Sequence, residues 1–183
     1  MKIELLAEHP EFVPTLAAWH HREWAYLRPG DTIEARIARL RASCGRTSPP
    51  IVYIAVEGNA VRRSAMLLPQ DMDTRLELSP WLAGVFTAPE FRGQGIATAL
   101  SRHVVQVAKT CGFERLYLYT PGAETFYARL GWKVVERTSY RGADVTIMDL
   151  VCVRDTSGNS VLSAHEAMNR TRSRSGAGGS RQS

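Results

Sequence analysis

A glycine-rich turn, Arg92-Gly93-Gln94-Gly95-Ile96-Ala97, constrains the fold of this chain more than any other segment. An apolar run over 81–88 precedes it and a helix-like stretch over 98–111 follows it, which predicts a strand, a tight turn and a helix. Glycine allows the backbone to approach an anion closely. The first N–H groups of the helix and the positive end of its dipole add to the attraction. The pattern therefore predicts a phosphate-binding turn.

The rest of the chain up to residue 153 alternates between helical and strand-like patterns, which indicates one α/β domain. Asp31 or Thr32 is placed to cap the second helix. The predicted elements are a strand at 2–6, helices at 11–27 and 32–43, strands at 51–56, 61–68 and 82–87, a helix at 98–111, a strand at 115–120, a short helix at 123–130, and a hairpin of strands at 132–138 and 145–153.

Residues 154–183 differ in composition from the preceding domain, because serine, glycine and arginine dominate and large apolar residues are scarce. Such a segment cannot bury enough surface to offset the entropy of ordering, so we expect a polar, disordered C-terminal tail. Five arginines against two acidic residues place much of the net charge of +5 in this tail. Because the charge is largely a property of the tail, it is weak evidence for a nucleic-acid partner, and the short Arg-Ser stretch lacks interleaved aromatic residues, so we do not expect such a partner.

The sequence favours a cytoplasmic protein. The first ten residues carry charges and do not resemble a signal peptide, and no run of about eighteen apolar residues predicts a membrane span. Three scattered cysteines, at 44, 111 and 152, are typical of free thiols in a reducing compartment. No histidine or cysteine spacing predicts a metal site, since the adjacent His20 and His21 fall on different helix faces. The oligomeric state, monomer or homodimer, is left open.

A second motif, Phe126-Tyr127-Ala128-Arg129-Leu130-Gly131-Trp132, follows the glycine turn in the chain. Together with the segment from Val85 to Ala97 and the order of elements, it resembles the GCN5-related N-acetyltransferase (GNAT) superfamily over residues 1–153. The resemblance implies a mixed, mostly antiparallel central sheet with helices on both faces. It also implies that the strands before and after the long helix splay apart where the cofactor binds.

The same resemblance implies acetyl-CoA as the co-substrate and assigns residues to it. The strand edge formed by Val85, Phe86 and Thr87 would pair with the pantetheine amides, and one of its amides would polarise the thioester carbonyl. Thr120 and Phe126 would also contact the cofactor, although many relatives have asparagine at the position of Thr120. The pyrophosphate would be held by backbone N–H groups of Arg92, Gly93, Gln94, Gly95, Ile96, Ala97 and Thr98.

The resemblance makes Tyr127 the donor of a proton to the departing thiolate. Many relatives carry an acidic base in the strand before the turn, but 82–85 contains no carboxylate here. Glu77, a few residues upstream, is the first candidate for the base, with Asp71 and Asp73 as alternatives. An ordered water chain or plain solvent is a further alternative.

The acceptor site is the least determined part of the sequence. Glu23 and Trp24 lie in the region that borders the acceptor cleft in relatives, although Trp24 equally fits a role as a core anchor. No cysteine occupies a nucleophile position, so we expect direct transfer in a ternary complex to a primary amine on a small molecule, such as an aminoglycoside-like compound. The alternatives are a protein or peptide N-acetyltransferase and a non-catalytic CoA-binding regulatory module.

Overall fold

The computed structural model describes residues 1–91 and 96–152, and within these ranges the strands form one seven-stranded sheet. The predicted turn residues Arg92 to Gly95 and the predicted tail from 154 lie outside the described residues. The strands are β1 (Lys2–Leu5), β2 (Ile51–Glu57), β3 (Ala60–Leu68), β4 (Trp81–Thr87), β5 (Arg115–Thr120), β6 (Lys133–Tyr140) and β7 (Ala143–Val151). The helices are α1 (Val13–Trp24), α2 (Ile33–Ala42), α3 (Ile96–Thr110) and α4 (Glu124–Arg129), with short 3-10 turns η1 (Leu6–Glu8), η2 (Pro10–Phe12), η3 (Ala25–Leu27) and η4 (Pro89–Phe91).

The strand order is β1-β2-β3-β4-β5-β7-β6, and every neighbouring pair is antiparallel except β4 and β5. The expected mixed, mostly antiparallel sheet is therefore confirmed. The last hairpin enters the sheet through its second strand, so β7 lies between β5 and β6. The sequence pattern predicted this hairpin but did not show which of its strands pairs with β5.

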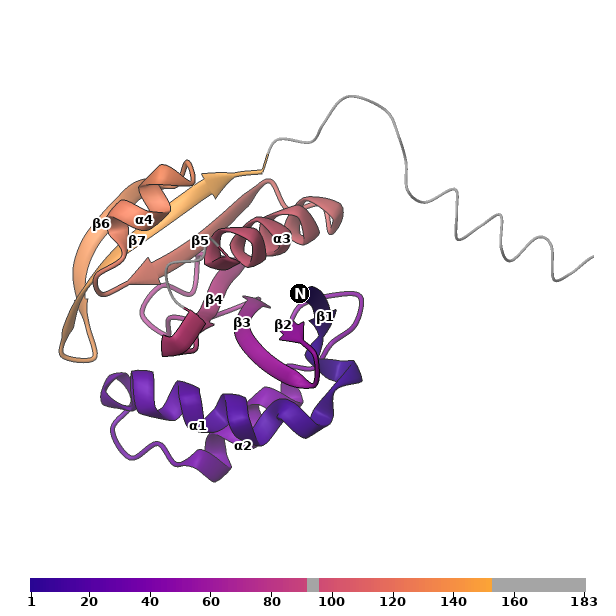
Figure 1. Cartoon of the computed structure of the whole chain (residues 1–183). Helices are drawn as coiled ribbons and strands as arrows, with labels where there is room; N and C mark the ends of the chain where they lie inside the picture. Colours follow the sequence, from indigo (N-terminus) through magenta and orange to yellow (C-terminus); the bar gives the residue numbers. More distant parts are fainter. Residues whose placement is uncertain (92–95, 153–183) are drawn as a thin grey trace, which may run out of the picture. The chain divides into compact units, whose positions relative to one another are not determined.

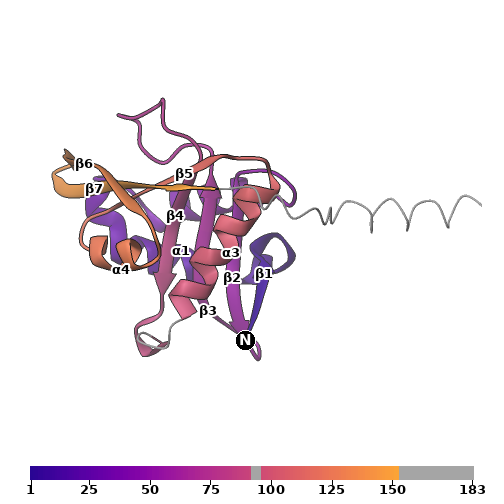
Figure 2. The ribbon, with the colours of Figure 1, turned by 90° about the horizontal axis from the view of Figure 1, so that it is seen from above.

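Helices cover both faces of the sheet, with α3 and α4 on one face and α1 and α2 on the other (Figures 1 and 2). The alternation of side chains along a strand explains the two layers. On β2, Ile51 and Tyr53 pack in the cluster that includes α3, whereas Val52 and Ile54 pack in the cluster with α1 and α2. Each face of β2 is thus apolar, and the strand is buried on both sides.

The helix boundaries follow local capping chemistry. Thr32 caps α2, because its side-chain oxygen accepts a hydrogen bond from the backbone N–H of Ala35 at 3.1 Å. The predicted helix over 11–27 is shorter in the structure, where α1 lies between the 3-10 turns η2 and η3. Proline at the start of α1 fits this boundary, since proline has no N–H to donate and is tolerated in a first turn.

Strands β4 and β5 diverge, which confirms the splay that the family resemblance implied. Their parallel ladder in the described residues consists of the single pair Trp81 and Tyr117, joined by a bond from the Tyr117 N–H to the Pro80 carbonyl at 2.9 Å. Beyond that point β4 continues to Thr87, paired with β3 on its other side. Divergence of two central strands opens the sheet at their far ends. Among the described helices, none is long and apolar enough to cross a membrane.

Candidate active site

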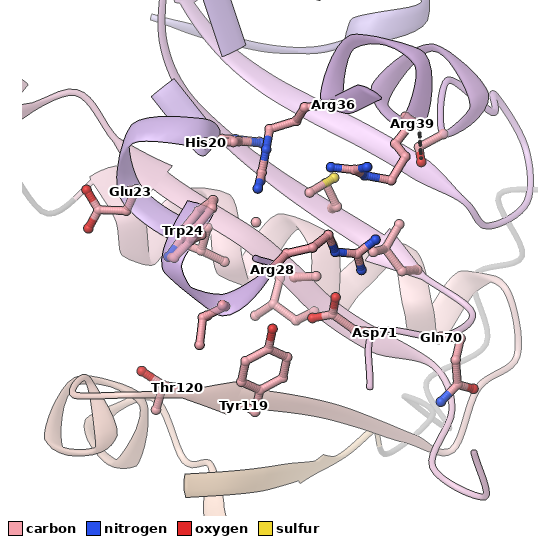
Figure 3. Close-up of a pocket in the computed structure, with 18 of the residues that line it drawn as sticks. His20, Glu23, Trp24, Arg28, Arg36, Arg39, Gln70, Asp71, Tyr119 and Thr120 are labelled. Carbon is pink, nitrogen blue, oxygen red and sulfur yellow. Dashed lines mark hydrogen bonds between the residues drawn. The ribbon is translucent and has the colours of Figure 1, made fainter. Parts of the chain in front are cut away.

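A cleft of about 750 Å³ lies where the sheet opens, and its walls come from several separate parts of the chain. Strand β4 contributes 82–85, and the end of β5 with the start of α4 contributes 119–123 and Tyr127. The end of α1, the segment after it and α2 supply a wall rich in polar side chains (Figure 3). The loop after β3 and the tip of the last hairpin complete the lining. The cleft thus draws on both faces of the sheet.

A bulge in β4 shapes the cleft at Gly84, where the register between β3 and β4 shifts. Gly84 has φ +55°, a conformation that other residues rarely adopt, and a Cβ there would lie 2.1 Å from the Met66 methyl carbon. Its carbonyl accepts a hydrogen bond from the Ser64 hydroxyl at 3.0 Å, and Ser64 lies 2.8 Å from Nε2 of His20. Because the hydroxyl donates to Gly84, Nε2 of His20 is the donor to Ser64.

His20 is neutral in this arrangement. Its side chain is buried, and this burial, with a smaller contribution from the Arg36 charge, lowers its pKa to about 3. The ring also contacts Trp24, with centroids 5.0 Å apart, and Phe86, with centroids 6.1 Å apart. A side chain on α1 therefore reaches through Ser64 to the backbone of β4 at the bulge.

Tyr127 enters the cleft from α4, on the opposite face of the sheet from α1. The ring is buried against Phe126 and Trp132, with centroid distances of 4.9 and 6.0 Å. Burial raises the pKa of the phenol to about 12, so it stays protonated at neutral pH. The turn before α4 is held by Thr120, whose hydroxyl oxygen accepts a hydrogen bond from the Ala123 N–H at 3.0 Å. Thr120 therefore fixes the turn that leads to Tyr127.

Arg28, Arg36 and Arg39 line the cleft on the α1 and α2 side, and Arg141 lines it from the tip of the last hairpin. Asp31 is buried and accepts a hydrogen bond from both Arg36 and Arg39, each at 2.5 Å and each on a different carboxylate oxygen. Burial alone would raise the pKa of Asp31, but these two guanidinium groups hold that pKa below its ordinary value. One carboxylate thus neutralises two arginines only in part.

Asp71 is the carboxylate that the loop after β3 places in the cleft, between Arg28 and Tyr119 (Figure 3). Burial raises its pKa to about 6, while the Arg28 and Arg141 charges oppose that shift. At neutral pH the group is ionised but close to its titration range. The neighbouring Asp73 is exposed and paired with Arg141 at 2.6 Å, outside the set of residues that line the cleft.

The structure brings several of the predicted site residues together at this cleft. They are Glu23, Trp24, Val85, Thr120 and Tyr127. Others lie elsewhere. Phe86 points to the α1 face and packs on Trp19 and Trp24, with centroids 5.3 and 6.0 Å apart, and Phe126 packs with the α3 cluster. Glu77 is exposed in the loop before β4 and does not line the cleft, so the structure does not bring it to Tyr127.

The predicted pyrophosphate site is described only at its C-terminal end. Ile96 is the first residue of α3, so the helix begins directly after Gly95 in the sequence. Ala97 and Thr98 lie in its first turn and are half-buried. Thr87, at the end of β4, is half-buried. No group of three or more histidine, cysteine, aspartate or glutamate side chains in the described part of the chain could hold a metal ion.

Sequence reasoning missed the arginine wall. Arg28, Arg36 and Arg39 carry no motif, and on a helix such as α2 their spacing looks like an ordinary solvated face. The one signal in the sequence was their carboxylate partner Asp31, which precedes α2. It lies five residues before Arg36 and eight residues before Arg39. That spacing alone is common, and only the fold shows that the three guanidinium groups meet.

Comparison with known proteins agrees with this architecture. A model of the acetyltransferase (GNAT) family matches residues 13–132, whereas no curated protein matches the chain. The fold is similar to that of the yncA protein of Salmonella typhimurium, solved with its cofactor acetyl-CoA, with a TM-score of 0.63 and 16% identity over 87% of this chain and 98% of that chain. It is also similar to an aminoglycoside 6'-N-acetyltransferase complexed with coenzyme A, with a TM-score of 0.66 and 16% identity over 84% and 98% of the two chains. An N-acetyltransferase from Staphylococcus aureus Mu50 has a TM-score of 0.64 and 15% identity, over 84% and 100%.

Proposed function

The chain belongs to the GNAT family of acetyltransferases, and we propose that it transfers the acetyl group of acetyl-CoA to a primary amine of a small molecule. The observation that carries this proposal is the cleft between the diverging strands β4 and β5, which Val85 and Tyr127 both line. Two of the similar structures are described with acetyl-CoA or coenzyme A bound, which supports acetyl-CoA as the co-substrate.

The edge of β4 would hold the cofactor. Past Trp81 the ladder to β5 ends, so the backbone groups of β4 on that side face the cleft and can pair with the pantetheine amides as an added strand would. The bulge at Gly84 changes the direction in which the backbone N–H groups after it point. One of these N–H groups would donate to the thioester oxygen as negative charge develops there. The pyrophosphate would bind at the start of α3, and the main-chain N–H groups of Arg92 to Thr98 would be its donors.

We assign proton removal to Asp71 in place of Glu77. An acceptor amine with a pKa near 10 arrives as an ammonium ion and must lose a proton before nitrogen attacks the acetyl carbon. Asp71 lies in the cleft, and its pKa of about 6 suits a base that works near neutral pH. The attack forms a carbon–nitrogen bond, and collapse of the tetrahedral intermediate breaks the carbon–sulfur bond.

Tyr127 would then donate to the leaving sulfur. A thiolate with a pKa near 8.5 needs little help, and a phenol with a raised pKa serves as a hydrogen-bond donor to it throughout the working pH range. None of the three cysteines lines the cleft, which supports direct transfer without an acetyl-cysteine intermediate.

The proposal is tested by Tyr127→Phe, assayed for thiol release from acetyl-CoA with a panel of amines. We expect kcat to fall roughly 100-fold, as loss of a positioned proton donor typically does, with the Kd for acetyl-CoA nearly unchanged. Tyr26→Phe is the matched control, because Tyr26 is exposed in η3 and does not line the cleft.

Two results would count against the proposed activity. If acetyl-CoA causes no thermal stabilisation of the wild-type chain, the cofactor assignment is wrong. If acetyl-CoA binds but no amine of the panel, including amino-terminal peptides, releases thiol, the chain is a CoA-binding module without turnover.

A further inference from the structure

The charge of the acceptor wall identifies a class of substrate. Arg28, Arg36 and Arg39 extend into the same part of the cleft, from the segment after η3 and from α2 (Figure 3). Their carboxylate partners are Asp31, which bonds two of them, and Asp71, which lies beside Arg28. Three guanidinium groups thus face two carboxylates, and one positive charge remains unbalanced.

Arg36 is only partly satisfied by its carboxylate partner. Its Nε is buried and has no hydrogen-bond partner among the described residues, although Nη2 bonds Asp31. Burial and the nearby charges of Arg39 and Arg28 lower the pKa of its guanidinium, which the Asp31 carboxylate only partly opposes. A planar guanidinium presents five donors, so this group and its neighbours have N–H groups left for an oxyanion.

Among the described residues, the remaining charges near this wall do not balance the surplus. Arg141 is paired with Asp73 at 2.6 Å, so this pair is neutral. Glu23 lines the cleft, but its carboxylate points away from the three arginines in Figure 3. A polycationic acceptor would meet three like charges here, which disfavours the aminoglycoside-like compound that the sequence suggested.

We propose that the acceptor is an amine that also carries an oxyanion, a carboxylate or a phosphate, which Arg28 and Arg39 bind beside Arg36. This inference rests on the proposed acetyl transfer and names its substrate class. The oxyanion balances the surplus positive charge, and the amine end lies toward Asp71, the base. Guanidinium groups recognise both carboxylate and phosphate through paired N–H donors.

Matched amine pairs test the proposal through thiol release from acetyl-CoA. The pairs are lysine with its decarboxylated form cadaverine, and O-phosphoethanolamine with ethanolamine, so the two sources of oxyanion are separated. We expect kcat/KM to be roughly tenfold higher for the member that carries the oxyanion in at least one pair. Arg28→Gln and Arg39→Gln should each remove that preference by raising the KM for the member that carries the oxyanion. Arg41→Gln is the matched control, because Arg41 is exposed on α2 and does not line the cleft.

A second measurement tests the site even where no amine of the panel reacts. Inorganic phosphate, added to the chain already saturated with coenzyme A, should raise the melting temperature of the wild type and of Arg41→Gln but not of Arg39→Gln. Absence of this stabilisation in the wild type, or preference for the member without the oxyanion in both pairs, overturns the proposal. Failure of acetyl-CoA to bind would instead contradict the proposed function itself.

Discussion

Burial raises the pKa values of two side chains of the cleft, Asp71 and Tyr127, but the two groups are left in opposite protonation states near neutral pH. Burial disfavours the charged form of each, and the resulting values are about 6 and about 12. Near neutral pH the carboxyl is therefore mostly an acceptor of protons, while the phenol is always a donor. In the proposed reaction, a pair of titratable groups separated in this way would provide a base for the ammonium and a donor for the thiolate.

The pH dependence of kcat/KM checks the role of Asp71. Below about pH 6 the wild type loses its ionised base, so kcat/KM should fall by one further power of ten per pH unit. Asp71→Asn should lack this additional limb and should reduce kcat/KM roughly 100-fold at neutral pH. The control is Asp73→Asn, which changes an exposed carboxylate outside the cleft. If Glu77→Gln, and not Asp71→Asn, lacked the acidic limb of the pH profile, Glu77 would be the base, as the sequence favoured.

At the scale of elements, the bulge of β4 is the feature on which the cleft depends. It lies between the pairs Ser64–Phe86 and Met66–Ala83 of the β3–β4 ladder and contains Gly84 with its positive φ. The bond from Ser64 to the Gly84 carbonyl, backed by His20 of α1, holds the bulge from the other side of the sheet. The edge that would pair with the cofactor is thus positioned in part by α1, which lies on the opposite face of the sheet from α3 and α4.

Gly84→Ala measures how closely this bulge is packed, and Gly58→Ala is its matched control. Both glycines have nearly the same φ, +55° and +58°, so both alanines carry a backbone strain of roughly 1–2 kcal/mol. Only at position 84 does the new Cβ meet a neighbour, because Met66 lies in its place and position 58 is open. We expect the free energy of unfolding to fall by roughly 1–3 kcal/mol more in Gly84→Ala. Equal losses in urea denaturation would show that Met66 moves aside freely.

The sequence predicted the elements well because their signals are local. Thr32 marks the start of α2, and β-rich apolar stretches on either side of a turn mark β2 and β3 within a residue or two. Motifs likewise placed Tyr127 at the cleft. The convergence of Arg28, Arg36 and Arg39 had no such signal, because it depends on how separate segments pack. Glu77 and Asp71 share one loop, and only packing distinguishes them.

That packing comes from apolar anchors in the loop between β3 and β4. Met72 and Leu78 pack in the cluster around Trp81, and the Trp81 indole N–H donates to the Leu78 carbonyl at 2.7 Å. With these anchors buried, Asp71 faces the cleft, while Glu77 faces solvent. Hydrophobic contacts between residues distant in the sequence thus decide which carboxylate reaches the site, and no spacing rule contains that information.

On the scale of the whole molecule, the layered fold couples its stability to the protonation of one buried histidine. His20 lies between α1 and the sheet, and its pKa is about 3 in the folded chain against an ordinary value of 6.5. Between these values the unfolded chain binds a proton that the folded chain does not. Lowering the pH through this window therefore favours unfolding, by about 1.4 kcal/mol for each pH unit below 6.5.

Asp71 acts in the opposite direction, so His20→Gln is needed to isolate the effect. The folded pKa of Asp71, about 6, lies above its ordinary 3.8, and its contribution to stability therefore grows as the pH falls between these values. In the wild type the two contributions partly cancel. The stability of the wild type relative to His20→Gln, measured by urea unfolding from pH 6.5 downward, should fall steadily as the pH is lowered. A constant difference would mean that the folded chain accepts a proton on His20 as readily as the unfolded chain does.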